Sequence, residues 1–207
     1  MKKIITTLLA ASMLFSVMAL PATAATDEDT FVDFVAQQAD KRRGSYNVIG
    51  NVVLALADSG ELTGADVAAL GSAELTAFLP TDRAFRRLAA DLQGKRWWQV
   101  RESSVIPFLV DTLGLPTIAE VVKYHIYADG KVDYRTAKSL DSNRRNGTDV
   151  FIEMYNGGDL GIDRRGWWLQ LDDAGTAGFG TNNPWVVRPN IHAGNAIVHG
   201  ISEVLLP

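Results

Sequence analysis

The stretch Phe78-Leu79-Pro80-Thr81-Asp82-Arg83-Ala84-Phe85 decides the fold of this chain. It closes a short apolar run, 75–79, which predicts a buried strand, and it passes through a Pro-Thr-Asp turn into a helix. Thr81 or Asp82 can accept hydrogen bonds from the free amides at the start of that helix. Apolar residues at i, i+3, i+4 and i+7, from Phe85 to Leu92, form one face of the helix, and charged residues form the other. The sequence therefore predicts a buried strand that leads into an amphipathic helix.

Two later segments accompany this stretch. Tyr124-His125 ends another predicted helix, and the run Asn195-Ala196-Ile197-Val198-His199-Gly200-Ile201 continues to Leu205-Leu206-Pro207. In this order and at these separations, the three segments resemble the first box, the central Tyr-His pair and the closing box of a fasciclin domain. The resemblance covers about residues 31–207, and its departures, at Leu79, Ala196 and Ser202, are local.

The resemblance implies both a fold and a general role. The implied fold is α+β, a β-wedge or sandwich of about seven strands with several helices packed along it. The implied role is extracellular, mostly adhesive and non-enzymatic. The resemblance also assigns a structural rather than catalytic part to a set of motif residues. These are Phe78, Pro80, Thr81, Asp82, Phe85, Tyr124, His125, Asn195 and His199.

The periodicity of the sequence also predicts a mixed α+β domain. Helical patterns dominate the first half of the chain and alternating patterns the second. The expected helices cover 31–39, 48–56, 63–70, 81–92, 104–113 and 116–125. The expected strands cover 75–79, 148–155, 160–162, 166–171, 185–187, 191–192 and 196–206, with a loop at 172–184. Helices gathered early and strands gathered late are typical of an α+β arrangement.

The first 24 residues are predicted to be an export signal. Lys2 and Lys3 precede an uncharged stretch, 8–20, and Ala22-Thr23-Ala24 is a small-residue cleavage site. The uncharged stretch is shorter than the roughly 20 residues of a membrane span. We therefore expect one domain at 25–207, without membrane insertion after cleavage, that is secreted, held at the cell surface or periplasmic.

The amino-acid composition limits the classes of partner that this chain is expected to bind. The leader holds two of the 20 basic residues and none of the 24 acidic ones, so the remaining chain carries a formal charge of −6. A net acidic chain is not expected to bind nucleic acid, because neutralising phosphates requires a basic face. The chain has no cysteine, so it forms no disulfide and offers no thiol nucleophile. Its stability must come from burial of an apolar core.

The three histidines suggest two alternatives, a zinc site or structural roles. His199 shares strand parity with Ile197 and Ile201, so its ring is expected to point into the core as a neutral, hydrogen-bonded imidazole. His125 belongs to the Tyr-His pair, and the sequence does not decide the role of His192. We expect no metal site and no cofactor.

Catalytic motifs are not found in the sequence. It has no Gly-x-Ser-x-Gly elbow and no phosphate-binding glycine loop. Asp82 follows Pro80-Thr81 and precedes a helix, so a capping role for that helix is favoured over a catalytic one. The sequence therefore predicts a protein that is not an enzyme.

The unusual feature of the sequence is that basic residues directly precede pairs of tryptophans. Arg96 precedes Trp97-Trp98, and Arg164-Arg165-Gly166 precedes Trp167-Trp168. Alternation from Gly166 predicts that Trp167 lies in the core and Trp168 faces outward. There Trp168 could stack on a sugar ring, anchor a protein interface, or merely cover a neighbouring segment. We take as binding candidates Trp168, Arg164, Arg165, Trp97 and Trp98.

Together these patterns predict an exported fasciclin protein that mediates adhesion or matrix association through an extracellular protein or polysaccharide. The first alternative is a glycan- or lignocellulose-binding module that uses exposed tryptophan, and the second is an uncharacterised hydrolase. Asn146-Gly147-Thr148 has the form of a glycosylation acceptor.

Overall fold

The computed structural model describes residues 30–41, 44–140, 150–173 and 183–207. Its helices are α1 (Phe31–Ala39), α2 (Asn47–Ser59), α3 (Gly64–Ser72), α4 (Asp82–Leu92), α5 (Val105–Leu113), α6 (Leu115–Lys123) and α7 (Tyr134–Leu140), with short 3-10 turns at Trp97–Gln99 and Glu102–Ser104. Its strands are β1 (Leu75–Pro80), β2 (Ile126–Tyr127), β3 (Phe151–Glu153), β4 (Asp159–Arg165), β5 (Trp168–Asp172), β6 (Val186–Ala193) and β7 (Ala196–Ile201). The predicted α+β class, with about seven strands, is confirmed.

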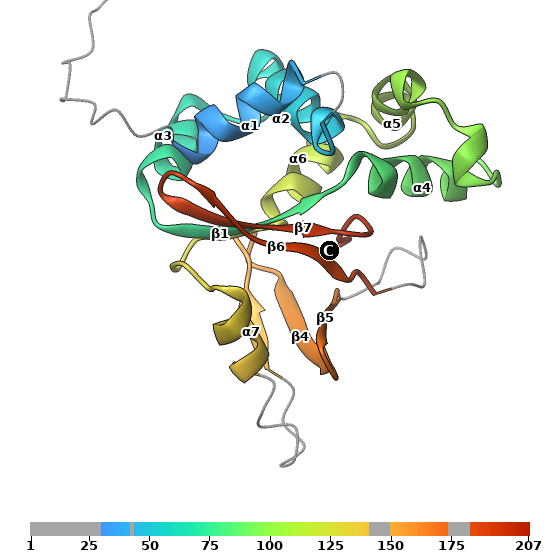
Figure 1. Ribbon diagram of the computed structural model, residues 1–207. Helices are drawn as coiled ribbons and strands as arrows, with labels where there is room; N and C mark the ends of the chain where they lie inside the picture. The colour runs from blue at the N-terminus through green and yellow to red at the C-terminus, as the bar shows by residue number, and fades with distance from the viewer. Residues whose placement is uncertain (1–29, 42–43, 141–149, 174–182) are drawn as a thin grey trace, which may run out of the picture.

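The strands form two sheets. One has the order β2-β1-β7-β6, and in it β1 and β7 run parallel, with Leu75 opposite Ala196 and Pro80 opposite Ile201. The other has the order β3-β4-β5 and is antiparallel. The first and last motif segments are therefore neighbouring strands. Figure 1 shows α1 to α6 gathered on one side of the first sheet, and β4, β5 and α7 on the other.

Two apolar cores follow from this arrangement. The larger lies between the helices and the first sheet, and it includes Leu56, Phe85 and Val198. The smaller lies between the sheets and includes Phe78, Leu169 and other residues of both sheets. Since β1 sends Leu79 to one core and Phe78 to the other, all of its residues are buried.

The motif residues hold elements that are distant in sequence. Asn195 accepts a hydrogen bond from the amide of Phe31 at 2.8 Å and donates to the carbonyls of Leu70, at 3.0 Å, and Ala73. The Tyr124 hydroxyl donates to the carbonyl of Asp159 at 2.6 Å. The closing motif thus fixes the ends of α1 and α3, and the Tyr-His pair joins the two sheets.

The side chain of Asp82 caps a different helix from the one predicted. Thr81 caps α4 by accepting from the amide of Ala84 at 3.3 Å. The carboxylate of Asp82 instead accepts from the amide of Val48 at 2.8 Å, in the first turn of α2. Residue Tyr46, which precedes α2, supplies no capping side chain. The predicted capping of α4 by Asp82 is therefore wrong, because its side chain turns toward the neighbouring helix.

Other differences from the predicted elements are local. Helix α7 and strand β2 were not expected, and β6 is one strand where two short ones were predicted. Register shifts between Val186 and Ile191, together with a positive φ of 58° at Asn190, interrupt the alternation of β6.

Glycine is required at position 200 of β7, where a Cβ would overlap the hydroxyl of Tyr46.

Candidate binding groove

The β4–β5 hairpin places Trp168 on an exposed face. In its register, Arg165 lies opposite Trp168 and Asp163 lies opposite Gln170, so these four side chains share one face. Leu169 and Leu171 point to the other face and are fully buried. Trp168 is 60% exposed, and it faces outward as predicted.

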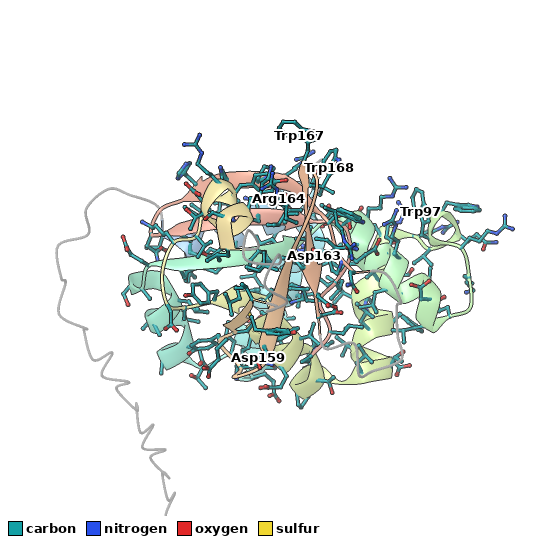
Figure 2. All side chains as sticks on the ribbon, turned by 90° about the horizontal axis from the view of Figure 1, so that it is seen from below. Trp97, Asp159, Asp163, Arg164, Trp167 and Trp168 are labelled. Atoms are coloured by element: carbon teal, nitrogen blue, oxygen red, sulfur yellow. The ribbon has the colours of Figure 1, made fainter. Side chains whose placement is uncertain are left out.

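The predicted core position of Trp167 is wrong. Trp167 is 85% exposed, because β5 begins at Trp168 and Gly166-Trp167 form the two-residue loop of the hairpin. Gly166 has a φ of 65°, and a glycine with positive φ at the first position is the arrangement of a type II′ turn. Strand parity ends where the strand pairing ends, so Trp167 lies at the hairpin tip with Trp168 beside it (Figure 2).

Trp185 completes the site, and sequence reasoning did not assign it there. It forms an isolated bridge with Gln170, which lies two residues after Trp168 on β5. Two hydrogen bonds with Ser202 fix the backbone of Trp185. The Ser202 amide donates to the Trp185 carbonyl at 3.0 Å, and the Ser202 hydroxyl accepts from the Trp185 amide at 3.0 Å. Trp185 is 36% exposed. No signal in the sequence links 185 to 168, because the link is a contact between the two sheets.

These side chains line an open groove of about 810 Å³, which we call the tryptophan groove. It lies where the β5 edge meets the ends of β6 and β7. Its lining combines two indoles, one aliphatic side chain and several polar groups. The residues are Trp168, Trp185, Val187, Arg87, Arg165, Gln170, Asn183, Ser202 and Glu203.

The charges in the tryptophan groove are paired. Arg165 Nε lies 2.6 Å from the Asp163 carboxylate, and Arg87 forms an ion pair with Glu203. Burial raises the pKa of Glu203, although the nearby Arg87 acts in the opposite direction. The groove therefore presents oriented donors and acceptors beside the indoles, without a strong excess of one charge.

A second concavity of about 480 Å³ adjoins the first and shares Arg87, Val187 and Ser202 with it. Arg83 and Arg86 of α4 line it, and both guanidinium groups lie over the ring of Trp97, at 4.3 and 5.2 Å from its centroid. Trp97 is thus half-buried against α4, and it lines neither the tryptophan groove nor the second concavity. Figure 2 shows Trp97 well apart from Trp168.

The other two candidates do not line either concavity. Arg164 lies opposite Leu169 and therefore on the far face of β4, where its Nε donates to the carbonyl of Gly166 at 3.1 Å. Trp98 is 55% exposed and meets Trp97 edge-on, with Arg96 over its ring. Of the five candidates, the structure brings Trp168 and Arg165 together in the tryptophan groove, while Trp97 and Trp98 contact each other outside it.

The structure places His125 and His199 in the interior, with backbone partners on both ring nitrogens. His125 Nδ1 lies 2.6 Å from the Val121 carbonyl and Nε2 accepts from the Leu205 amide at 2.9 Å. His199 Nε2 lies 2.9 Å from the Val132 carbonyl and Nδ1 accepts from the Asn190 amide at 3.3 Å. Each pattern requires a neutral ring with one proton, and burial lowers both pKa values, that of His125 to about 4.

His192 is exposed on β6. Across the described ranges, no three His, Asp or Glu side chains gather as metal ligands would.

In the same ranges no single helix has the length and apolar composition of a membrane span. The helices Glu102–Leu113 and Leu115–Lys123, which are bent by 106° at their junction, have that length and composition only when taken as a pair. The Asn146-Gly147-Thr148 acceptor lies outside the described residues.

The fasciclin domain family matches residues 55–207, so the chain belongs to this family, which points to an adhesion-type, generally non-enzymatic protein of the cell surface or extracellular space. Curated proteins gave no match. Among solved structures, the chain is similar to a FAS1 domain pair from the insect cell adhesion molecule fasciclin I, at 14% identity and a TM-score of 0.47, over 72% of this chain and 45% of that one. It therefore spans less than half of that structure's length.

Proposed function

We propose that this chain is an exported, single-domain adhesion or matrix-association protein that binds an extracellular protein or polysaccharide in the tryptophan groove. The leader, 1–24, is removed, and the domain at 25–207 acts without catalysis. The single observation that carries the proposal is that Trp168 and Trp185, both accessible, line one groove at the junction between the two sheets.

Exposed indoles in a concave site are suited to recognition. An indole offers a large, rigid apolar surface and loses little conformational entropy on binding. Tryptophan and arginine are also the residues that most often dominate binding energy at protein interfaces. In the groove, Trp168 is flanked by Arg165 and Gln170, so a partner can bury its apolar surface against the rings and satisfy its polar groups at the edge.

A glycan- or lignocellulose-binding module is the second candidate, and the same pair of indoles favours it. Sugar rings present flat C–H faces that stack on indoles, while their hydroxyl groups need fixed donors and acceptors. Gln170, Asn183 and Ser202 supply amide and hydroxyl groups next to the rings. The geometry of the groove is compatible with both partner classes, so the experiment must separate them.

The test is a binding assay with the chain 25–207, whose start at Ala25 is first checked by intact mass of the exported protein. Glycan arrays and insoluble polysaccharides are compared with an extracellular protein fraction as targets. Trp168→Ala and Trp185→Ala should each weaken binding at least about tenfold. Trp167→Ala is the matched control, because it removes an even more exposed indole that lies outside the groove.

The outcomes distinguish the proposals. Retention on polysaccharide that depends on both groove tryptophans supports the glycan module, and retention of protein with the same dependence supports protein-mediated adhesion. If all three variants bind like the wild-type chain, the groove is not the binding site.

A further inference from the structure

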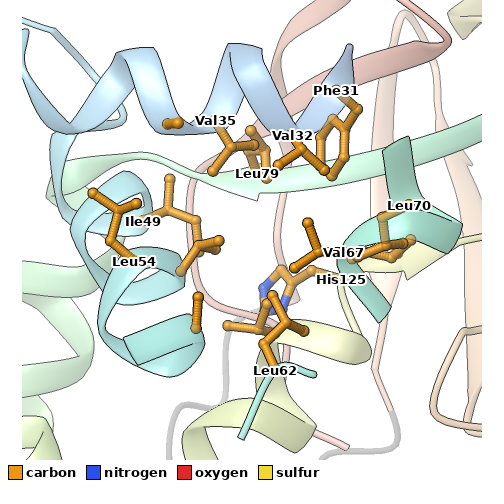
Figure 3. A pocket seen from close by; sticks show the side chains of 15 residues that line it. Phe31, Val32, Val35, Ile49, Leu54, Leu62, Val67, Leu70, Leu79 and His125 are labelled. Atoms are coloured by element: carbon orange, nitrogen blue, oxygen red, sulfur yellow. The ribbon is translucent and has the colours of Figure 1, made fainter. Parts of the chain in front are cut away.

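An apolar cavity of about 120 Å³ lies on the helical side of the first sheet, far from the tryptophan groove in the fold. Side chains from α1, α2, α3 and β1 point toward one another around it (Figure 3). They include Val32 and Val35 of α1, Ile49 of α2, Val67 of α3 and Leu79 of β1. The cavity shares no lining residue with the groove.

His125 is the only polar side chain among the 15 that line the cavity, and it offers no hydrogen bond to the interior of the cavity. Its Nδ1 is engaged by the Val121 carbonyl and its Nε2 by the Leu205 amide. The imidazole therefore presents ring carbons and is neutral. An occupant that hydrogen-bonds or carries charge inside the cavity would find no partner there, which excludes polar ligands and makes a bound water unfavourable.

The size of the cavity sets the size of the occupant. Protein interiors rarely contain voids much larger than a water molecule. An engineered apolar cavity of about 150 Å³ in another protein stays dry and binds benzene or xenon. A volume of about 120 Å³ is close to that value and suits a single apolar group of about six heavy atoms.

The cavity has a side that reaches the surface. Leu54, on its lining, is 42% exposed, and Ala57 beside it on α2 is exposed as well. The sequence that precedes α1 after the leader, Ala25-Thr26-Asp27-Glu28-Asp29, is polar and acidic. A segment of this composition does not suit an apolar cavity, so it is not the occupant that we propose.

We propose that this cavity binds one apolar group about the size of benzene. The group is either a free small apolar molecule or the terminal part of an acyl chain whose polar end stays in solvent near Leu54 and Ala57. This site is independent of the function proposed for the tryptophan groove.

The test uses methyl-labelled chain 25–207 titrated separately with benzene and with octanoate, followed by methyl NMR. Binding should shift the methyl resonances of Ile49, Leu62, Val67 and Leu79 and leave those of Val187 unchanged. Saturation by benzene alone identifies a free small molecule as the ligand class, and tighter binding of octanoate identifies an acyl chain. If neither probe shifts the cavity methyls, the proposal is wrong.

Two variants make the result specific. Ala36→Leu adds volume on the cavity wall and should reduce the affinity for either probe at least about tenfold. Ala68→Leu is the matched control, since Ala68 lies exposed on α3 and does not line the cavity. Equal affinities of Ala36→Leu and the wild-type chain would overturn the proposal. Should Ala36→Leu fail to fold, Val67→Ala enlarges the cavity instead and should admit naphthalene, and unchanged exclusion of naphthalene would count against the site.

Discussion

Acidification should destabilise the domain through His125. Burial lowers the pKa of this ring in the folded state to about 4, against 6.5 in the unfolded chain. Between these values the unfolded state binds a proton that the folded state does not, so the free energy of unfolding falls as the pH falls. The neutral His125 ring makes its full contribution to the free energy of unfolding above pH 6.5, and this contribution is lost by about pH 4. The shift corresponds to about 3 kcal/mol.

The structural reason is visible in the hydrogen bonds of the ring. Nε2 of His125 accepts from the Leu205 amide, and a protonated ring would turn this acceptor into a second donor facing a donor. His199 has the same arrangement with the Asn190 amide, and burial lowers its pKa as well. His199 therefore contributes in the same direction, whereas buried carboxyls with raised pKa values, such as Asp82 and Glu203, contribute in the opposite one.

A matched variant isolates the contribution of His125. Gln at position 125 keeps a donor and an acceptor but does not titrate. Urea unfolding at a series of pH values from 7.5 to 4 should show that the wild-type chain loses about 3 kcal/mol more than His125→Gln. His192→Gln is the control, because it makes the same substitution at an exposed histidine. Parallel pH profiles for the wild type and His125→Gln would refute the reasoning.

Two further predictions concern residues whose placement differs from the sequence-based expectation. Asp82→Ala should lower the free energy of unfolding by about 1–3 kcal/mol, because the Val48 amide loses its acceptor, while Asp82→Asn keeps an acceptor and should retain most of the stability. Equal losses in chemical denaturation would contradict the capping of α2. Trp167→Ala should change the stability by no more than about 0.5 kcal/mol, because the side chain is exposed, whereas Leu169→Ala should cost about 2–5 kcal/mol as a core truncation. A melting experiment in which Trp167→Ala unfolds first would show that the hairpin tip is packed.

Individual strands and helices could be predicted from the local sequence pattern. The segment from Leu75 to Leu92 was predicted as strand and helix because its apolar pattern changes period at Pro80, and the structure confirms both. The parity of Ala196 to Ile201 indicated correctly that His199 is buried. In each case neighbouring residues in the sequence determine the environment, so local pattern is sufficient.

The sequence could not predict contacts between elements. Asp82 turns to α2, and no local pattern specifies which helix a carboxylate will cap when two helix starts lie near it. Trp185 lines the same groove as Trp168 only because it bridges to Gln170 of β5, across the junction between the two sheets. The error at Trp167 has a more local cause, since the alternating pattern was extended through Gly166, a residue that could equally mark the hairpin turn it forms.

The position of β7 has a consequence for the order of events during synthesis. This strand lies between β1 and β6 and contributes to both cores, yet it comes last in sequence order among the described strands. Until it emerges, β1 has an unpaired edge and both cores are incomplete, which are conditions that promote aggregation of a nascent chain. Pairing of strands so distant in sequence also makes folding slow compared with that of a helical bundle. The domain should therefore fold only after β7 has been synthesised.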